Sequence, residues 1–417
     1  MPFKPRKMKK VVPEAPKLQT KETKFLDLRN MDKITEAAVY YGFIPMETPK
    51  IEKVDLQKAK TLKEGEPMVH LGSNLEIKNL PEEKITILRN YLSSNLATMS
   101  QPVMIIYNNF LEEGASKKQT KNRKIDLEII GSSKSISEAV LIKTAIAILE
   151  DNDIKDIYVE INSIGDKESY SKYVRELTAY YRKNINTMQA HCRQAFKKDV
   201  FLTLACENEK CCSIKETAPK SISCLSEVSR QHFKEVLEYL ETLEIPYKIN
   251  ECLVSDRRYA NQTIFEIKQK SENPKNTDLS LGIGFRYDNL GKKVDLKKDI
   301  PAIGLKLNFK SESDKNQAPR IKRASVFFLQ LGDEAKHKSL RVIDILRKEN
   351  IFINHSLNRD KLGAQMAMAE RMRVPYILIM GKKEAMDDTV IVRNTTTRSQ
   401  EAIPVKDLAD YLKKIFK

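Results

Sequence analysis

The spacing of apolar positions divides the chain into helices and strands. Apolar side chains recur at helical spacing over residues 25–43, where Gly42 ends the pattern, and over residues 136–150. Shorter apolar runs bounded by polar loops favour buried strands. The expected strands cover residues 103–107, 124–131, 157–166, 253–266 and 284–288.

The last hundred residues alternate between the two patterns. This order predicts a small mixed sheet with helices on its faces. The expected strands are residues 325–329, 351–355, 376–380 and 390–394, and the expected helices are residues 340–350, 362–373 and 408–416.

Polar, proline-containing stretches set the domain boundaries. Residues 1–24 combine eight Lys or Arg residues with four prolines, which predicts a disordered basic tail. Residues 310–323 are polar with one proline and indicate a linker. The chain of 417 residues then contains a first domain at 25–309, with a mostly helical segment at about 170–245, and a second at 324–417.

The formal net charge of +16 and the sequence pI of about 9.3 favour a polyanionic partner. Nucleic acid is the natural candidate; the alternative is a lysine-rich surface that serves only solubility. No apolar run reaches the length of a membrane span, and the basic N-terminus lacks the apolar core of a secretory signal. We expect a cytoplasmic protein without a membrane partner, whose six cysteines stay reduced.

Two stretches carry a family resemblance. Residues 253–266 have the length of the motif L-V-R-G-L-D-Y-Y-T-G-T-V-F-E and match it at six positions, Leu253, Val254, Tyr259, Thr263, Phe265 and Glu266. Residues 284–288, G-F-R-Y-D, follow after a polar loop. Together they resemble the histidine-specific motifs of histidyl-tRNA synthetases, which are class II aminoacyl-tRNA synthetases. Gly284 is expected to let the backbone approach a ligand.

Further landmarks follow in order. Residues 48–52 resemble motif 1, a helix and strand at the dimer interface of class II enzymes, and residues 103–131 resemble the strand, loop, strand of motif 2. Residues 157–166 resemble the family's strand and turn I-N-S-I-G-D, in which we expect Asn162 and Gly165 to form the turn. The resemblance implies an α+β fold: a class II antiparallel sheet with helices, a helical insertion, and a C-terminal α/β anticodon-binding-type domain.

The positions that carry charge in the family are altered. Arginines are expected before Pro81, at Asn108 or Asn109, and at positions 255 and 311; none is present. Lys84 stands where the family has a threonine that touches histidine, and needs a counter-charge. The altered or retained active-site positions are Leu80, Glu82, Lys84, Lys124, Glu128, Ser255, Arg258, Tyr259, Arg286, Tyr287 and Ser311.

The insertion carries a candidate metal site. Cys192, Cys206 and Cys211 match the cysteine spacing of those relatives that have cysteines here. The relatives' first cysteine falls on Gln189, so His191 would supply a fourth ligand. A structural zinc ion and a set of free buried thiols both fit this pattern. Cys224 and Cys252 resemble ordinary core thiols, and His232 resembles a structural histidine.

Three functions fit the resemblance. Because an adenylating enzyme needs cations at the triphosphate, we expect a catalytically inactive relative that binds tRNA or another structured RNA and forms a homodimer. Arg359, Lys361 and Arg393 are the expected RNA contacts. The first alternative is a diverged but active histidine–tRNA ligase, which would use ATP and Mg²⁺. The second is a regulatory subunit of ATP phosphoribosyltransferase.

Overall fold

The computed structural model contains two sheets, each with its own set of helices. It describes residues 31–63, 81–111, 121–206, 208–254, 258–273, 276–294, 296–311, 326–357 and 359–416. The expected basic tail at 1–24 lies outside these ranges. Within the described residues no helix is long and apolar enough to cross a membrane.

The larger sheet has eight strands in the order β1-β2-β3-β8-β7-β6-β4-β5. Its inner strands pair antiparallel, whereas the edge strands β1 and β5 pair parallel to their neighbours. The strands are β1 (Ile44–Pro45), β2 (Val103–Leu111), β3 (Lys121–Ile130), β4 (Ile157–Gly165), β5 (Tyr247–Ile249), β6 (Asn261–Gln269), β7 (Leu279–Arg286) and β8 (Ala302–Ser311).

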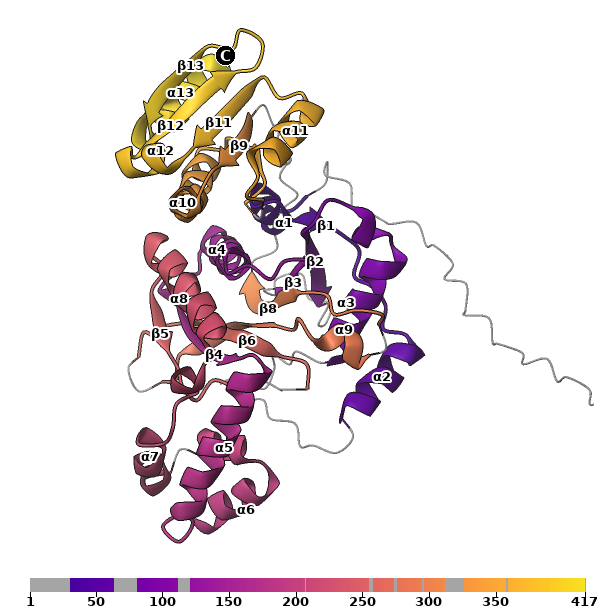
Figure 1. Cartoon of the computed structure of the whole chain (residues 1–417), viewed down its shortest axis with the longest axis vertical. Coiled ribbons are helices and arrows are strands. Elements are labelled where there is room, and N and C mark those ends of the chain that lie inside the picture. Colours follow the sequence, from indigo (N-terminus) through magenta and orange to yellow (C-terminus); the bar gives the residue numbers. More distant parts are fainter. Residues whose placement is uncertain are drawn as a thin grey trace, which may run out of the picture.

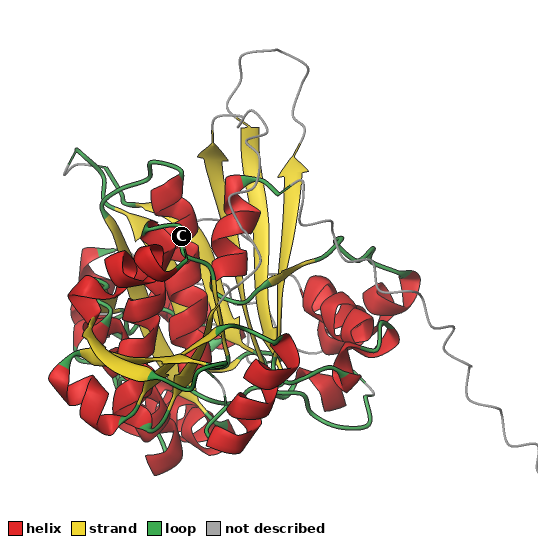
Figure 2. Cartoon of the chain, turned by 90° about the horizontal axis from the view of Figure 1, so that it is seen from above, coloured by secondary structure: helices red, strands yellow, loops and turns green. Residues whose placement is uncertain are grey.

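Helices cover both faces of this sheet (Figure 2). The helices α1 (Lys33–Tyr40), α4 (Ile136–Asp151) and α8 (Glu227–Thr242) contribute to the apolar core on one face. The helices α2 (Lys53–Lys63), α3 (Pro81–Ser93) and α9 (Leu290–Lys293), with the short 3-10 helix at Leu96–Thr98, enclose a second core on the other face. Since every residue of α4 from Ile136 to Leu149 is buried, this helix is the centre of the domain.

The segment expected to be helical is confirmed as helical. It contains α5 (Lys167–Lys183), α6 (Ala190–Lys198) and α7 (Glu209–Glu216), followed by α8, with 3-10 turns at Val200–Ala205 and Ser221–Cys224. Between α5 and α7 it has its own apolar cluster, which includes Tyr173, Leu177 and Phe201. Figure 1 shows α5 to α7 at the opposite end of the molecule from the C-terminal domain.

The C-terminal domain is the expected small mixed sheet, in the order β10-β9-β11-β12-β13. The sequence pattern missed two of its elements, α12 and β13. The strands are β9 (Val326–Gln330), β10 (Ile353–His355), β11 (Tyr376–Met380), β12 (Thr389–Asn394) and β13 (Gln400–Pro404). The helices are α10 (Asp333–Lys348), α11 (Leu362–Met372), α12 (Lys382–Asp387) and α13 (Leu408–Ile415), with a 3-10 turn at Val405–Asp407.

Helix α10 joins the two domains. The Asp344 carboxylate accepts a hydrogen bond of 2.7 Å from the Tyr41 hydroxyl and lies 3.0 Å from Nζ of Lys143. Nη1 of Arg347 lies 2.8 Å from Asp151 at the end of α4. These polar contacts fix the orientation of the C-terminal domain on α1 and α4.

Several sequence-based boundaries were wrong. Lys310 and Ser311, expected in the linker, are the last residues of β8; residues 312–323 lie outside the described ranges. The strand expected at 253–266 begins only at Asn261. Residues 48–52 form neither the helix nor the strand expected of motif 1.

Two conformational predictions had different outcomes. Gly165 lies at the end of β4 with a φ of 67°, as a turn residue requires. Asn162 lies inside β4 instead, fully buried, where its amide donates to the carbonyl of Leu253. The asparagine therefore holds the loop before β6 and forms no turn.

Candidate active-site cleft

Strand pairing brings charged side chains onto the face of the large sheet that α3 covers. On β3, the alternation of side chains places Lys124, Asp126 and Glu128 on this face. Directly opposite on β8, Gly304 pairs with Glu128, and Lys306 pairs with Asp126. We refer to this face, together with the first turn of α3, as the cleft.

Lys84 and Glu128 form an ion pair in the cleft that is closed to solvent, since neither residue has any exposed surface. The Tyr287 hydroxyl donates a second hydrogen bond of 2.6 Å to Glu128. The Lys84 ammonium also lies 5.7 Å from the ring centre of Phe285 and 5.4 Å from that of Tyr287. Burial alone would lower the pKa of Lys84, but the charges of Glu128 and Asp126 raise it above its usual value, so the lysine stays charged.

Glycine at position 304 makes room for this pair. A Cβ atom built there would lie 2.2 Å from Oε2 of Glu128 and 2.5 Å from Nζ of Lys84. Gly284, where we expected a ligand, faces the other way: a Cβ there would meet the ring of Phe265 at 2.2 Å. The prediction for Gly284 was wrong because the ring of Phe265, on the sheet face that α4 covers, fills the space beside this glycine.

A second charged group lies beside the first. Glu83, the next residue of α3, pairs with Lys306, and its other oxygen lies 3.3 Å from Nζ of Lys124. Nζ of Lys306 lies 4.0 Å from Asp126. Burial raises the pKa of Asp126, and burial lowers the pKa of Lys306 despite its acidic neighbours. Each of the three cleft lysines, at positions 84, 124 and 306, therefore already has a carboxylate partner.

Arg286 and Tyr259 have structural surroundings. Arg286 is fully buried on the α4 face, where it binds Glu138 at 2.6 and 2.8 Å, lies 3.2 Å from Asp288 and donates to two backbone carbonyls. Nε2 of His232 lies 2.7 Å from the same Glu138, a contact that fits the structural role expected of this histidine. Tyr259 is buried against the ring of Phe285 at 5.5 Å and forms part of the cleft wall.

Other expected site residues lie away from the cleft or outside the described ranges. The Asn108 side chain donates to Asp32 at the start of α1, on the opposite sheet face. Ser311 also points to that face, where its hydroxyl donates to Asn152 at 2.7 Å, because β8 continues as a strand through this residue. Arg258 is buried, and its carbonyl accepts from Lys293. Leu80 and Ser255 lie outside the described residues, and Glu82 is half-buried in the first turn of α3.

The sequence missed Glu83, Lys306 and Phe285 as cleft residues. Alternation along each strand could have placed the two strand residues, since 304 and 306 share a face, as do 285 and 287. Nothing in the sequence indicated that the first turn of α3 lies over both strands.

The expected RNA contacts do not form one group. Arg359 follows β10 and its guanidinium donates to Ser100 of the first domain, so it lies at the domain junction. Lys361 is exposed just before α11. Arg393 lies near the opposite end of the small sheet, half-exposed, directly across from Gln400 of β13.

Three exposed arginines lie near Arg393. The Thr395 hydroxyl bonds the carbonyl of Val374 at 2.9 Å, so the loop after β12 meets the loop before β11. Arg373 and Arg398 lie in these two loops, and Arg371 lies in the last turn of α11; all three are exposed.

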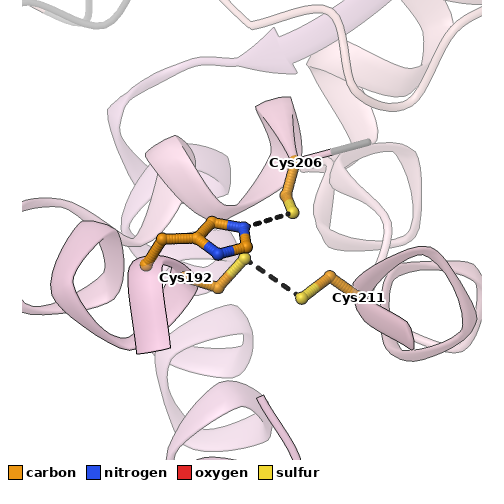
Figure 3. A group of neighbouring side chains, drawn as sticks. Cys192, Cys206 and Cys211 are labelled. Carbon is orange, nitrogen blue, oxygen red and sulfur yellow. Dashed lines mark hydrogen bonds between the residues drawn. The ribbon is translucent and has the colours of Figure 1, made fainter. Parts of the chain in front are cut away.

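The cysteines expected to bind zinc lie together (Figure 3). Nε2 of His191 lies 3.2 Å from Sγ of Cys206, and Sγ of Cys211 lies 3.1 Å from Sγ of Cys192. All four ligand atoms lie within 4.8 Å of one another. Cys224 is buried in the apolar cluster that includes Tyr173, Leu177 and Phe201, and Cys252 packs against this cluster.

Comparison with known proteins agrees with this architecture. Residues 325–415 match the model of the anticodon binding domain. The chain is 26% identical over 396 residues to a histidine–tRNA ligase of Dehalococcoides mccartyi, covering 90% of this chain and 93% of that protein. It is 27% identical over 383 residues to the histidine–tRNA ligase of Fervidobacterium nodosum, covering 88% and 90%. The apo histidyl-tRNA synthetase of Staphylococcus aureus superimposes with a TM-score of 0.48 at 22% identity, covering 91% and 94%.

A largely antiparallel sheet between two helical layers, followed by an anticodon-binding domain, is the architecture of a class II aminoacyl-tRNA synthetase. Within that class, the chain belongs to the histidyl-tRNA synthetase family.

Proposed function

We propose that this protein binds tRNA or a tRNA-like RNA and does not activate histidine. The observation that carries the proposal is the closed ion pair of Lys84 with Glu128, together with the neighbouring pairs of Glu83 with Lys306 and Lys124. Binding a triphosphate and stabilising its transition state require cations that carboxylates have not already neutralised. Here carboxylates already neutralise the cleft lysines.

The side chain at position 84 also supports a protein that does not activate histidine. The resemblance puts a histidine-contacting threonine at position 84, and a lysine there fills the volume above Phe285 and Tyr287. An incoming imidazole would have to displace an ammonium from Glu128, which would leave a buried charge without its partner. The fully buried Arg286 cannot replace a catalytic arginine, because Glu138 and Asp288 hold it on the other sheet face.

The second candidate is an active, diverged histidine–tRNA ligase that uses ATP and Mg²⁺. Its support is similarity to such ligases along about nine-tenths of the chain. The two candidates differ in histidine-dependent exchange of pyrophosphate into ATP. We expect no exchange above the no-enzyme background; exchange that requires histidine would refute the inactive assignment and favour the ligase.

RNA binding is supported by the net charge of +16 and the anticodon-binding domain. Filter binding with tRNA(His) transcript, an unrelated tRNA and a single-stranded RNA of equal length tests it. We expect tRNA to bind more tightly than the unstructured RNA, with affinity falling as salt rises. Equal, weak binding of all three would leave only non-specific charge attraction and contradict the proposal.

We also propose that the protein acts as a homodimer in the cytoplasm. Exposed apolar side chains lie in and directly after the segment that resembles motif 1, the expected dimer contact: Ile51, Val54 and Leu56 are 46, 40 and 51% exposed. Sedimentation is expected to give a dimer that Leu56→Glu dissociates. A monomeric native protein contradicts this assignment.

A further inference from the structure

We propose that His191, Cys192, Cys206 and Cys211 hold one structural zinc ion in the helical insertion. The four donor atoms lie within 4.8 Å of one another, with closest approaches of 3.1 and 3.2 Å. In a tetrahedral site with zinc–sulfur bonds of about 2.3 Å, donor atoms are separated by about 3.7 Å. The observed separations bracket this value, so small side-chain rotations complete the site.

The donor set selects the metal. Three thiolates and one imidazole suit zinc and other thiophilic ions, whereas Mg²⁺ and Ca²⁺ require oxygen donors. Four protein ligands fill a tetrahedral shell and leave no position for water or a substrate. The geometry therefore assigns a structural role to the ion.

The ligands join the ends of three short elements. His191 and Cys192 lie in the first turn of α6, Cys206 follows the 3-10 turn at Val200–Ala205, and Cys211 lies in the first turn of α7. Among the described residues of this segment no strand connects these elements, and they pack around a small apolar cluster with Phe201 and Leu204. Closing the loop from 191 to 211 with one ion would stabilise the arrangement by restricting the unfolded chain.

A lysine side chain lies beside the four donor atoms. Cys192 and Cys211 are buried, and Nζ of Lys215 donates to the carbonyls of Leu204 and Cys206 at 3.3 and 3.1 Å, which brings a positive charge next to a site of net negative charge.

Cys212 supplies a matched control. It follows Cys211 directly, but its thiol points to the carbonyl of Cys206 at 3.6 Å and is not among the four donors. A cysteine-to-serine change at 211 should therefore remove a ligand, while the same change at 212 should not.

Elemental analysis of the full-length protein, purified in reductant and dialysed against metal-free buffer, tests the assignment. We expect about one zinc per chain in the native protein and in Cys212→Ser and Cys224→Ser, and a loss of at least fivefold in Cys206→Ser and Cys211→Ser. Less than about one zinc per ten native chains overturns the proposal, as does equal loss in Cys212→Ser and Cys211→Ser.

Cobalt gives a readout that does not depend on variant folding. Native protein stripped of metal and supplied with Co²⁺ should show the intense visible bands of a tetrahedral site and sulfur-to-cobalt charge-transfer bands, and Zn²⁺ should bleach both. A weak octahedral spectrum would contradict the site. A Cys192–Cys211 disulfide, detected by mass in protein purified without chelator, would also contradict it.

Discussion

The ammonium of Lys84 and the carboxylate of Glu128 meet in the interior of the molecule, without any exposed surface on either residue. The lysine comes from the first helix turn above the sheet, and the glutamate comes from a central strand. Lys84 stands at the position where the family resemblance expects a threonine that touches histidine. The ammonium of Lys84 is the counter-ion of the Glu128 carboxylate.

Removing Lys84 should destabilise the fold. Lys84→Met leaves Glu128 as a buried, unpaired charge, and the free energy of unfolding should fall by about 3–5 kcal/mol in urea titrations. The double variant Lys84→Met, Glu128→Gln removes both charges and should recover at least half of the loss. A double variant as unstable as the single one would show that the pair does not act as a charge pair.

Gly304→Ala should also destabilise the protein, because the added methyl group would lie within 2.2 Å of Glu128. We expect a loss of about 1–3 kcal/mol. The control is Gly363→Ala in α11, where nothing lies within 4 Å of the new atom and stability should rise by about 0.5 kcal/mol. Similar thermal midpoints for the two variants would contradict the close packing at Gly304.

Glu138 should make stability fall in acid. Burial alone would raise its pKa, but the charges of Arg286 and His232 lower it to about 2. Because the folded pKa lies below the unfolded value of about 4.3, this stabilisation is complete above that value and is lost as the pH falls towards 2. The contribution reaches about 3 kcal/mol at most.

Comparison of unfolding free energies at pH 5 and pH 3 checks this dependence. Glu138→Gln should be less stable than the native protein at pH 5 but should lose less stability on acidification. Glu227→Gln on the exposed side of α8 should retain the native slope. Equal slopes in all three proteins would argue against the role of Glu138.

Arg347→Ala should loosen the docking of the C-terminal domain, since its guanidinium bridges α10 to Asp151 of the first domain. Limited trypsin digestion should release the C-terminal domain several times faster than from the native protein. Arg341→Ala changes an exposed arginine of the same helix and should leave the rate unchanged. Faster release from both variants would point to a general loss of stability.

Arg393→Glu should weaken tRNA binding if the end of the small sheet that carries Arg371, Arg373 and Arg398 is the contact surface. The charge reversal should reduce affinity by about tenfold or more and lower the salt dependence by about one to two counterions. Arg341→Glu changes the net charge equally on α10 and serves as the control. Equal weakening by both changes would exclude a localised surface at Arg393.

The sequence by itself determined the elements whose pattern depends on near neighbours. The helix expected at 136–150, the helical insertion and most of the C-terminal sheet followed from periodicity, because the repeating spacing of apolar residues indicates a helix or a strand without knowledge of distant contacts. The need of Lys84 for a counter-charge also followed from its chemistry, although the sequence did not name the partner.

Tertiary structure alone decided which charges meet. Glu128 is 44 residues from Lys84, and Lys306 is 223 residues from Glu83, so their contacts depend on strand register and on the position of a helix over the sheet. The same register turned Arg286 and Ser311 away from the cleft, because a shift of one residue along a strand changes the face on which a side chain lies. Local pattern fixes an element, but only the packing of elements distant in the sequence decides the electrostatics of a site.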